Sequence, residues 1–224
     1  MTHRQFSRNA ASSRAIPVRK MIEKVEKNPF VPIVWGTNQK GMQAGEEHSE
    51  QEVCRAAWNA SAALAVSCAK TMAEMGLHKQ IVSRLLEPFA WITVIATGVD
   101  HAWENFFSLR CHEDAEPHIQ EIAYMARSMY DENEPDLKEW SSAHPAGRHL
   151  PLTGFEGDEN LSNEELAKVS VSRCARVSYL THEGRRDVQA DIELHDRLAK
   201  SGHWSPFEHV AQTSEPPRNL GGNL

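Results

Sequence analysis

Residues 53–76 read VCRAAWNASAALAVSCAKTMAEMG and form a long periodic stretch of this 224-residue chain. Apolar side chains recur in it at intervals of three and four residues, at Val53, Ala57, Ala60, Leu64, Cys68, Met72 and Met75. That spacing is typical of one face of an α-helix, and Gly76 is placed to end the helix as a C-cap. We therefore predict a long amphipathic helix over 46–75, in which such a stripe faces the core.

Further segments show helical spacing and few show strand patterns. The helical segments are 78–94 with a kink or break at Pro88, then 100–109, 119–129, 162–177 and 187–200. Ser162 and Glu165 have capping-box spacing, although the alternation around Val169 leaves a strand as an alternative there. Residues 30–35 are the best strand candidate, and 181–186 resemble a loop. The sequence predicts a single domain over 1–224, with a surface connection at 131–160 and a disordered end at 215–224.

Composition excludes several classes of protein. The content of 40% hydrophobic and 25% charged residues is ordinary for a globular protein, and the net charge of −7 argues against a general nucleic-acid binder. Four widely spaced cysteines without a CxxC pair indicate a cytoplasmic, reduced protein. The apolar stretch 89–99 is too short to span a bilayer, so we do not expect this chain to be a membrane protein. The spacings of the twelve histidines do not favour a metal site, and we predict none.

The run from His3 to Arg14 gathers three arginines, a histidine and three serines with almost nothing apolar. Such side chains can bind phosphate, but a disordered basic tail has the same composition. Arg84, Arg110 and Arg176 interrupt apolar sequence, which fits either ordinary ion-paired arginines or a shared anionic pocket. Cys174 lies between two arginines, and a core position is favoured over a reactive thiol.

Five segments of the chain resemble motifs of one family. The start reads Thr2-His3-Arg4, followed by Ser7, Asn9, Ala10, Ser12, Arg14 and Ala15. This resembles the RHRxxSxNExSxRY signature of the flavin-dependent thymidylate synthases (ThyX), with six positions in agreement and departures at Thr2, Ala10 and Ala15. Residues 84–88 (RLLEP), 105–119 (with Glu116 in place of the usual Gln), 175–179 (ARVSY) and 202–209 (GHWSPFEH) resemble further motifs of that family.

The order of these motifs resembles a circularly permuted, phage-associated branch, because ARVSY and GHxSPxEH here follow the RHR-like signature instead of preceding it. Permutation is tolerated where the original termini lie close together at the surface. Family members place a strand and the beginning of a helix ahead of that signature, so the resemblance implies that the run from His3 to Arg14 is the end of a helix and a structured loop. Permuted relatives continue into a GNFRGW-like segment after the last motif. The resemblance therefore implies a chain truncated at both ends.

The resemblance implies an α+β fold, mainly helical with a small antiparallel sheet. It implies reductive methylation of dUMP to dTMP with methylenetetrahydrofolate, FAD and NADPH, in a homotetramer with sites between subunits. Residues carried over to dUMP are Ser12, Arg14, Arg84 and Arg110, of which Ser12 and Arg14 hold the phosphate. Arg110 is the catalytic residue, because a cation beside the uracil ring favours the negative charge that develops there. Residues carried over to FAD are His3, Arg4, Asn9, Asn105, His203 and Ser205.

Two other hypotheses stay open at this stage. One is an inactive nucleotide- or flavin-binding fragment of the same fold. The other is a helical interaction protein with an unstructured basic N-terminal arm, for which deletion of residues 1–16 leaves ligand binding unchanged.

Overall fold

The computed structural model describes residues 5–40, 44–133, 148–177 and 187–212. Its contacts gather the chain into two compact units. The helical unit comprises Ala10–Val94 and Gly98–Asn133, and the C-terminal unit comprises Met1–Asn9, Ile95–Thr97 and Glu134–Leu224. Each is described below by itself. Together they are mainly helical with a small antiparallel sheet, as the sequence predicted.

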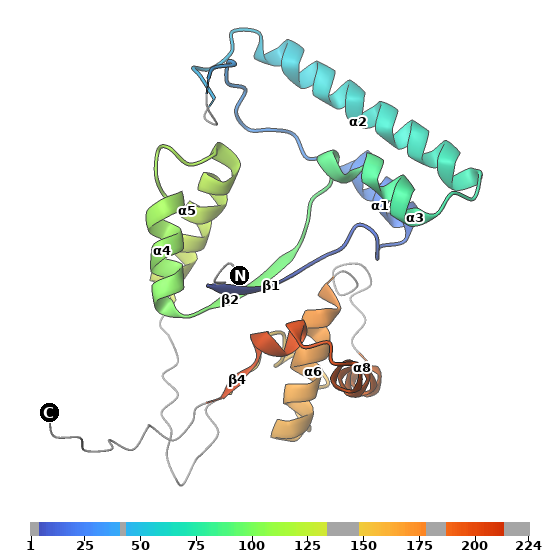
Figure 1. The fold of residues 1–224 in the computed structure, drawn as a ribbon, viewed down its shortest axis with the longest axis vertical. Helices are drawn as coiled ribbons and strands as arrows, with labels where there is room; N and C mark the ends of the chain where they lie inside the picture. The colour runs from blue at the N-terminus through green and yellow to red at the C-terminus, as the bar shows by residue number, and fades with distance from the viewer. Residues whose placement is uncertain (1–4, 41–43, 134–147, 178–186, 213–224) are drawn as a thin grey trace, which may run out of the picture. The chain divides into compact units, whose positions relative to one another are not determined.

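The helical unit is built on α2 (Gln51–Glu74), with α1 (Val18–Lys27) and α3 (Lys79–Val82) on one side of it (Figure 1). One core joins the three helices and the short 3-10 turns η1 (Ser83–Leu85) and η2 (Glu87–Phe89). Its buried members are Ile16, Met21, Ile22, Val25, Ala62, Val66, Ala69, Val82, Leu86 and Phe89. Gly76 has φ 78°, the left-handed conformation expected of a helix stop.

The buried face of α2 differs from the predicted one. Ala62, Val66 and Ala69 face the core, whereas Val53, Leu64 and Met75 of the predicted stripe are exposed. The reason is that α2 carries small apolar side chains around most of its circumference, so the spacing alone does not determine which face packs. Of the predicted stripe, Met72 does pack against the core.

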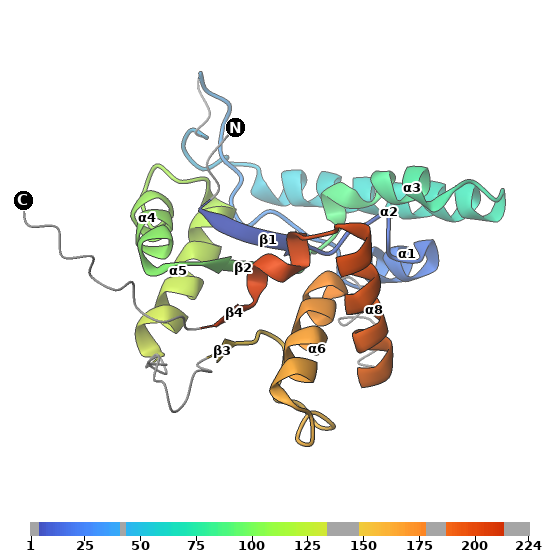
Figure 2. The same cartoon turned by 60° about the horizontal axis from the view of Figure 1, so that its bottom comes forward.

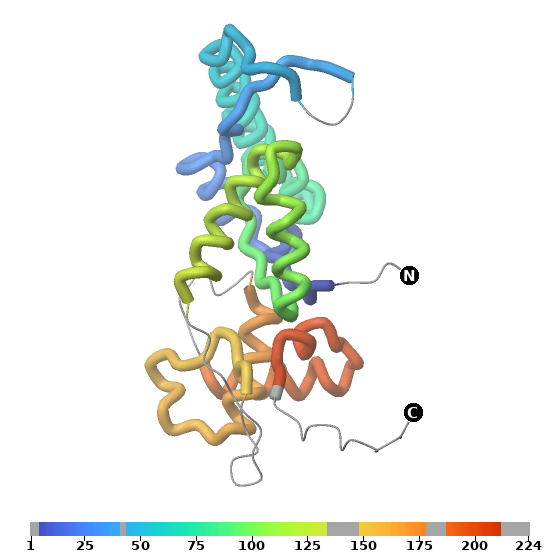
Figure 3. The backbone as a smooth tube through the Cα atoms, turned by 90° about the vertical axis from the view of Figure 1, so that its left-hand side faces the viewer, coloured from blue at the N-terminus to red at the C-terminus, as the bar shows by residue number. Residues whose placement is uncertain are grey.

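A second pair of helices completes the helical unit, α4 (Asp100–Arg110) and α5 (Pro117–Glu132), which Figure 3 shows side by side. Phe107 and Ala123 are buried between them. Glu116 caps α5, because its carboxylate accepts hydrogen bonds from the backbone N–H groups of His118 and Ile119 at 3.1 Å. Both helices were predicted, and Glu116 has a local structural role in this chain.

Three sequence predictions are wrong here. Residues 78–94 are not one helix with a kink or break at Pro88: α3 already ends at Val82, Pro88 lies within the 3-10 turn η2, and Val94 begins strand β2 (Val94–Gly98). Residues 30–35 form no ladder, and a single bridge joins Gly36 to Glu47 just beyond them. The family resemblance implied the end of a helix at the start of the chain, but β1 (Phe6–Ala10) is a strand that pairs with β2. The alternative of a disordered tail is also wrong from residue 5 onward.

The C-terminal unit centres on α6 (Asn163–Ala175) and α8 (Val188–Ser201), which pack together as Figure 2 shows. Ser162 and Glu165 form the predicted capping box of α6. Asp187 caps α8, and Gly202 ends it at φ 70°. Strand β3 (Arg148–His149) pairs antiparallel with β4 (Ala211–Gln212). The 3-10 turn η3 (Ser205–His209) precedes β4.

Arg173 lies at the middle of this unit, fully buried, and holds two carboxylates. Its guanidinium donates two parallel hydrogen bonds to Asp158, at 2.7 and 2.8 Å, and a third to Asp191 at 3.1 Å. Arg176 donates to the other oxygen of Asp191 at 2.8 Å. The Arg173 hydrogen bonds hold the pKa of the Asp158 carboxyl below its usual value, although burial acts in the opposite direction. These bonds thereby fix the segment that carries Asp158 to α6 and α8.

The Arg173 cluster changes the interpretation of 131–160. Residues 134–147 lie outside the described residues, as do 181–186 and 215–224. Residues 148–160 are part of the C-terminal unit, because buried Asp158 at the end of this segment pairs with Arg173. Asp158 is the buried residue of this described segment, whereas Gly157, Glu159 and Asn160 beside it are exposed.

We expect Asp158→Asn to lower the free energy of unfolding by about 3 kcal/mol, because a buried arginine then loses its bidentate partner. Asp196→Asn is the control, since the Asp196 side chain is 58% exposed and solvent screens its ion pairs. Urea unfolding followed by circular dichroism measures both variants. Equal losses in the two variants would show that the Arg173 cluster does not hold the unit together.

Candidate functional site

Two residues that the resemblance assigns to FAD lie in contact in the C-terminal unit. The Ser205 hydroxyl donates a hydrogen bond to Asn9 Oδ1 at 2.7 Å. Asn9 Nδ2 in turn donates to the carbonyl of Cys174 at 3.3 Å. These three residues come from the RHR-like segment, from GHWSPFEH and from the residue just before ARVSY. Segments more than 160 positions apart in sequence therefore meet at one polar cluster.

Both strands of the β1–β2 pair also contact η3. The Ser7 hydroxyl of β1 donates to Glu208 Oε2 of η3 at 2.9 Å. Thr97 Oγ1 of β2 lies 2.9 Å from Nδ1 of His209, also in η3. The paired strands β1 and β2 thus each hold the 3-10 turn by a side-chain contact. Sequence reasoning assigned no role to Ser7, Thr97, Glu208 or His209, although Ser7, Glu208 and His209 lie within the quoted motifs.

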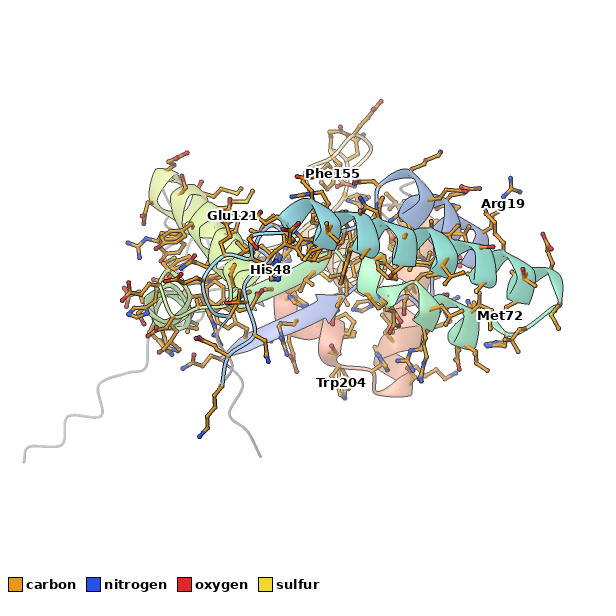
Figure 4. All side chains as sticks on the ribbon, turned by 90° about the horizontal axis from the view of Figure 1, so that it is seen from above. Arg19, His48, Met72, Glu121, Phe155 and Trp204 are labelled. Atoms are coloured by element: carbon orange, nitrogen blue, oxygen red, sulfur yellow. The ribbon has the colours of Figure 1, made fainter. Side chains whose placement is uncertain are left out.

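Local sequence explains why η3 presents its side chains here. Gly202 stops α8 with a left-handed residue, and Pro206 occupies the first turn of η3, where a missing N–H costs nothing. His203 and Trp204 consequently lie in the exposed turn between the two elements, and Ser205, also exposed, begins η3. Figure 4 labels Trp204, whose ring lies 5.3 Å from that of Phe207. His3 and Arg4, also predicted to contact FAD, lie outside the described residues.

The dUMP-assigned residues Ser12, Arg14 and Arg84 lie in the helical unit. The Ser12 carbonyl accepts hydrogen bonds from the N–H groups of Ala15 and Ile16, at 2.9 and 3.2 Å, which closes a tight turn. Arg14 is exposed at its tip, and Arg84 is exposed on η1.

Two contacts hold this turn, residues 12–16, against the segment that carries Arg84. The Ser13 hydroxyl donates to Glu87 Oε1 at 2.5 Å, and Lys79 Nζ donates to the Ala15 carbonyl at 3.2 Å. Ser12, Arg14 and Arg84 therefore belong to neighbouring segments of one unit. Lys79 is a further cation there that sequence reasoning missed, and nothing in its surroundings in sequence distinguishes it from a surface lysine.

Asn105 and Arg110 lie on a different element, α4, where both are exposed. The Asn105 carbonyl accepts a hydrogen bond from the Ser108 hydroxyl at 2.9 Å. Arg110 is in the last turn of α4, where a cation interacts favourably with the negative end of the helix dipole.

Two residues considered for chemistry are structural. Cys174 is fully buried, and burial raises the pKa of its thiol to about 11, so it is a core residue with no thiolate character. Arg176 pairs with Asp191 and with the Ala190 carbonyl at 2.6 Å. The anionic-pocket hypothesis is therefore wrong for Arg176, which is an ion-paired arginine.

Comparison with known proteins adds no name to this geometry: no family model, no curated protein and no solved structure matches the chain. Among the described residues, no group of three His, Cys, Asp or Glu side chains is arranged to hold a metal ion. Within the same residues, no helix has the length and apolar content needed to cross a membrane.

His209 of η3, which contacts Thr97, makes the stability of the C-terminal unit sensitive to pH. The side chain is fully buried, and its Nε2 has no hydrogen-bond partner among the described residues. Burial lowers the pKa of His209 below the usual histidine value of about 6.5, and a charge on His149 acts in the same direction while Glu208 opposes it. Below that value the unfolded chain binds a proton that the folded chain does not, so the free energy of unfolding falls as the pH falls.

We expect the free energy of unfolding to decrease between about pH 7.5 and about pH 5.5 more steeply in the wild type than in His209→Gln. Denaturant unfolding at several pH values measures the slope. His203→Gln is the control, because His203 is exposed and the wild-type slope should remain. A His209→Gln slope equal to the wild-type slope would mean that His209 is not the group that titrates.

Proposed function

We propose that the chain is a flavin-dependent thymidylate synthase that converts dUMP to dTMP with methylenetetrahydrofolate and NADPH. The observation that supports this most is the contact between Ser205 and Asn9. The resemblance assigns each to FAD from a separate motif, and the two motifs are far apart in the sequence. Two unrelated motif matches would have no reason to meet, so the contact favours a shared role.

The chemistry of the residues at this cluster suits a flavin. The ring edge of a flavin presents both acceptors and an N–H donor, and an amide with a hydroxyl complements both kinds of group. Asn9 is half-buried and Ser205 is exposed, so a ligand can reach them. FAD, when bound, supplies the hydride. This chain then needs to bind and orient, which agrees with the inert Cys174 thiol.

The turn at residues 12–16 suits a nucleotide phosphate for a similar reason. Arg14 and Arg84 offer two exposed guanidinium groups, and Ser12 offers a short hydroxyl. The hydrogen bond between Ser13 and Glu87 fixes the turn before a ligand arrives, which lowers the cost of binding. Arg110 is proposed as the catalytic cation beside the uracil ring.

We further propose that the enzyme is cytoplasmic and works as a homotetramer with sites between subunits. Exposed apolar side chains on α5 support an assembly of several copies, because a monomer rarely leaves so many in one stretch. They are Ile122, Tyr124, Met125, Met129 and Tyr130.

Asn9→Ala should weaken FAD binding about 10-fold, because the variant loses a half-buried amide that can both donate and accept hydrogen bonds. A titration of FAD followed by flavin fluorescence measures this. Asn59→Ala, an exposed position on α2, is the matched control and should bind as the wild type does. Equal affinities in all three proteins, with unchanged circular dichroism, would exclude Asn9 from a flavin site.

Arg14→Ala should weaken dUMP binding at least about 10-fold, because one charge-assisted contact to phosphate is removed. Arg19→Ala is the control, since Arg19 is exposed in the next segment and pairs with Glu23. Calorimetry on the flavin-loaded proteins measures both. An unchanged dUMP affinity in Arg14→Ala contradicts the assignment of the turn to phosphate.

A further inference from the structure

The long helix α2 has two apolar faces, and its own unit covers one of them. Ala62, Val66 and Ala69 pack against α1 and the segment after α2. On the opposite side Val53 is 62% exposed, Leu64 is 65% exposed and Met75 is 80% exposed. Figure 4 looks onto this helix from above, and in Figure 1 α1 and α3 both lie on its other side. A helix that is apolar all round is normally buried all round.

The exposed face is a continuous, uncharged stripe. With 3.6 residues per turn, its positions project within about 40° of Leu64 on either side. They are Val53, Ala57, Ala60, Leu64, Cys68, Thr71 and Met75, all exposed. The Thr71 hydroxyl donates to the Ser67 carbonyl of its own helix at 3.2 Å, which leaves its methyl group for packing. The stripe therefore has the spacing and character of a helix-pairing seam.

The stripe is symmetric about Leu64. Val53 and Met75 each lie 11 positions from it, Ala57 and Thr71 each lie seven, and Ala60 and Cys68 each lie four. A two-fold axis through Leu64 would therefore place every stripe position opposite another stripe position in an antiparallel copy. An isologous contact between identical chains requires such self-complementarity, and here the positions that would face one another are uncharged throughout, so no like charges would meet across the axis.

We propose that α2 pairs antiparallel with α2 of a second copy of this chain, with Leu64 on the two-fold axis. Large side chains at the ends, Val53 against Met75, then flank a centre in which alanines let the helices approach. The seam is about 33 Å long and one helix wide, so it buries on the order of 1,000 Å² in total with its corrugation. That area is at the lower limit of specific interfaces. The inference does not rest on the proposed function.

The first test is Leu64→Glu, which sets two carboxylates against each other on the axis. The substitution touches no core residue, so circular dichroism should be unchanged. Sedimentation equilibrium should show that the mass of the wild-type assembly is halved, to the 25.2 kDa of one chain if α2 alone holds a dimer. Asn59→Asp adds a charge off the stripe and should keep the wild-type mass. A wild-type monomer, or equal masses for wild type and Leu64→Glu, overturns the proposal.

A second test fixes the direction. In the antiparallel pair, residue 60 faces Cys68 of the other copy, whereas the two Cys68 positions are about 12 Å apart along the axis, beyond disulfide reach. Ala60→Cys, with Cys54 and Cys111 replaced by Ser, should therefore form a 60-to-68 disulfide between copies under mild oxidation. Asn59→Cys in the same background should not. Peptide mapping that finds Cys68 linked to Cys68, or no link between copies, overturns the antiparallel pairing.

Tritium release from dUMP and the mass of the assembly are separate readouts, so failure of either proposal leaves the other testable. Loss of pairing with normal activity removes the α2 seam alone. Pairing as expected in a protein without thymidylate synthase activity removes the proposed function alone.

Discussion

The C-terminal unit depends on the buried charge of Arg173. A fully buried guanidinium is tolerated only because every side of it is occupied: Asp158 binds it in a bidentate manner, Asp191 accepts from its Nε, and the Leu152 carbonyl accepts at 2.9 Å. These partners come from the segment before α6 and from α8. Arg173 directly precedes Cys174 on α6, so the cluster holds the part of the helix whose Cys174 carbonyl Asn9 contacts.

A chain of contacts leads from this cluster to the proposed flavin site. The Ser172 hydroxyl donates to the Asp191 carbonyl at 2.6 Å, beside Arg173 on the same helix. Gly202 then turns the chain out of α8 so that Ser205 meets Asn9. Buried His209 closes the other end of η3 against Thr97. Buried polar and charged groups make many of the contacts that hold the C-terminal unit together. Its stability should therefore depend more strongly on pH and on single charge changes than the stability of the helical unit, whose core is apolar.

Local signals in the sequence predicted most elements, because caps and stops act over a few residues. Ser162 with Glu165, Asp187, Gly76 and Gly202 each do in the structure what their chemistry indicates. The predictions that failed were those that depend on contacts between distant parts of the chain. Nothing in 53–75 tells which of two apolar faces of α2 is covered, since that depends on α1 and α3. Asp158 likewise resembles a loop residue until Arg173 is brought beside it. For the site, motif matching assigned Asn9 and Ser205 to the same ligand, and the two lie in contact, but no local pattern indicated Lys79.

Tritium release from 5-tritiated dUMP by the purified chain, with FAD, methylenetetrahydrofolate and NADPH, tests the proposed activity most directly. Thymidylate synthesis replaces the hydrogen at that position with a methyl group, so we expect tritiated water whose formation requires all three additions. Tritium that stays on dUMP, in protein that binds both FAD and dUMP, contradicts the enzyme and selects an inactive nucleotide- and flavin-binding protein instead.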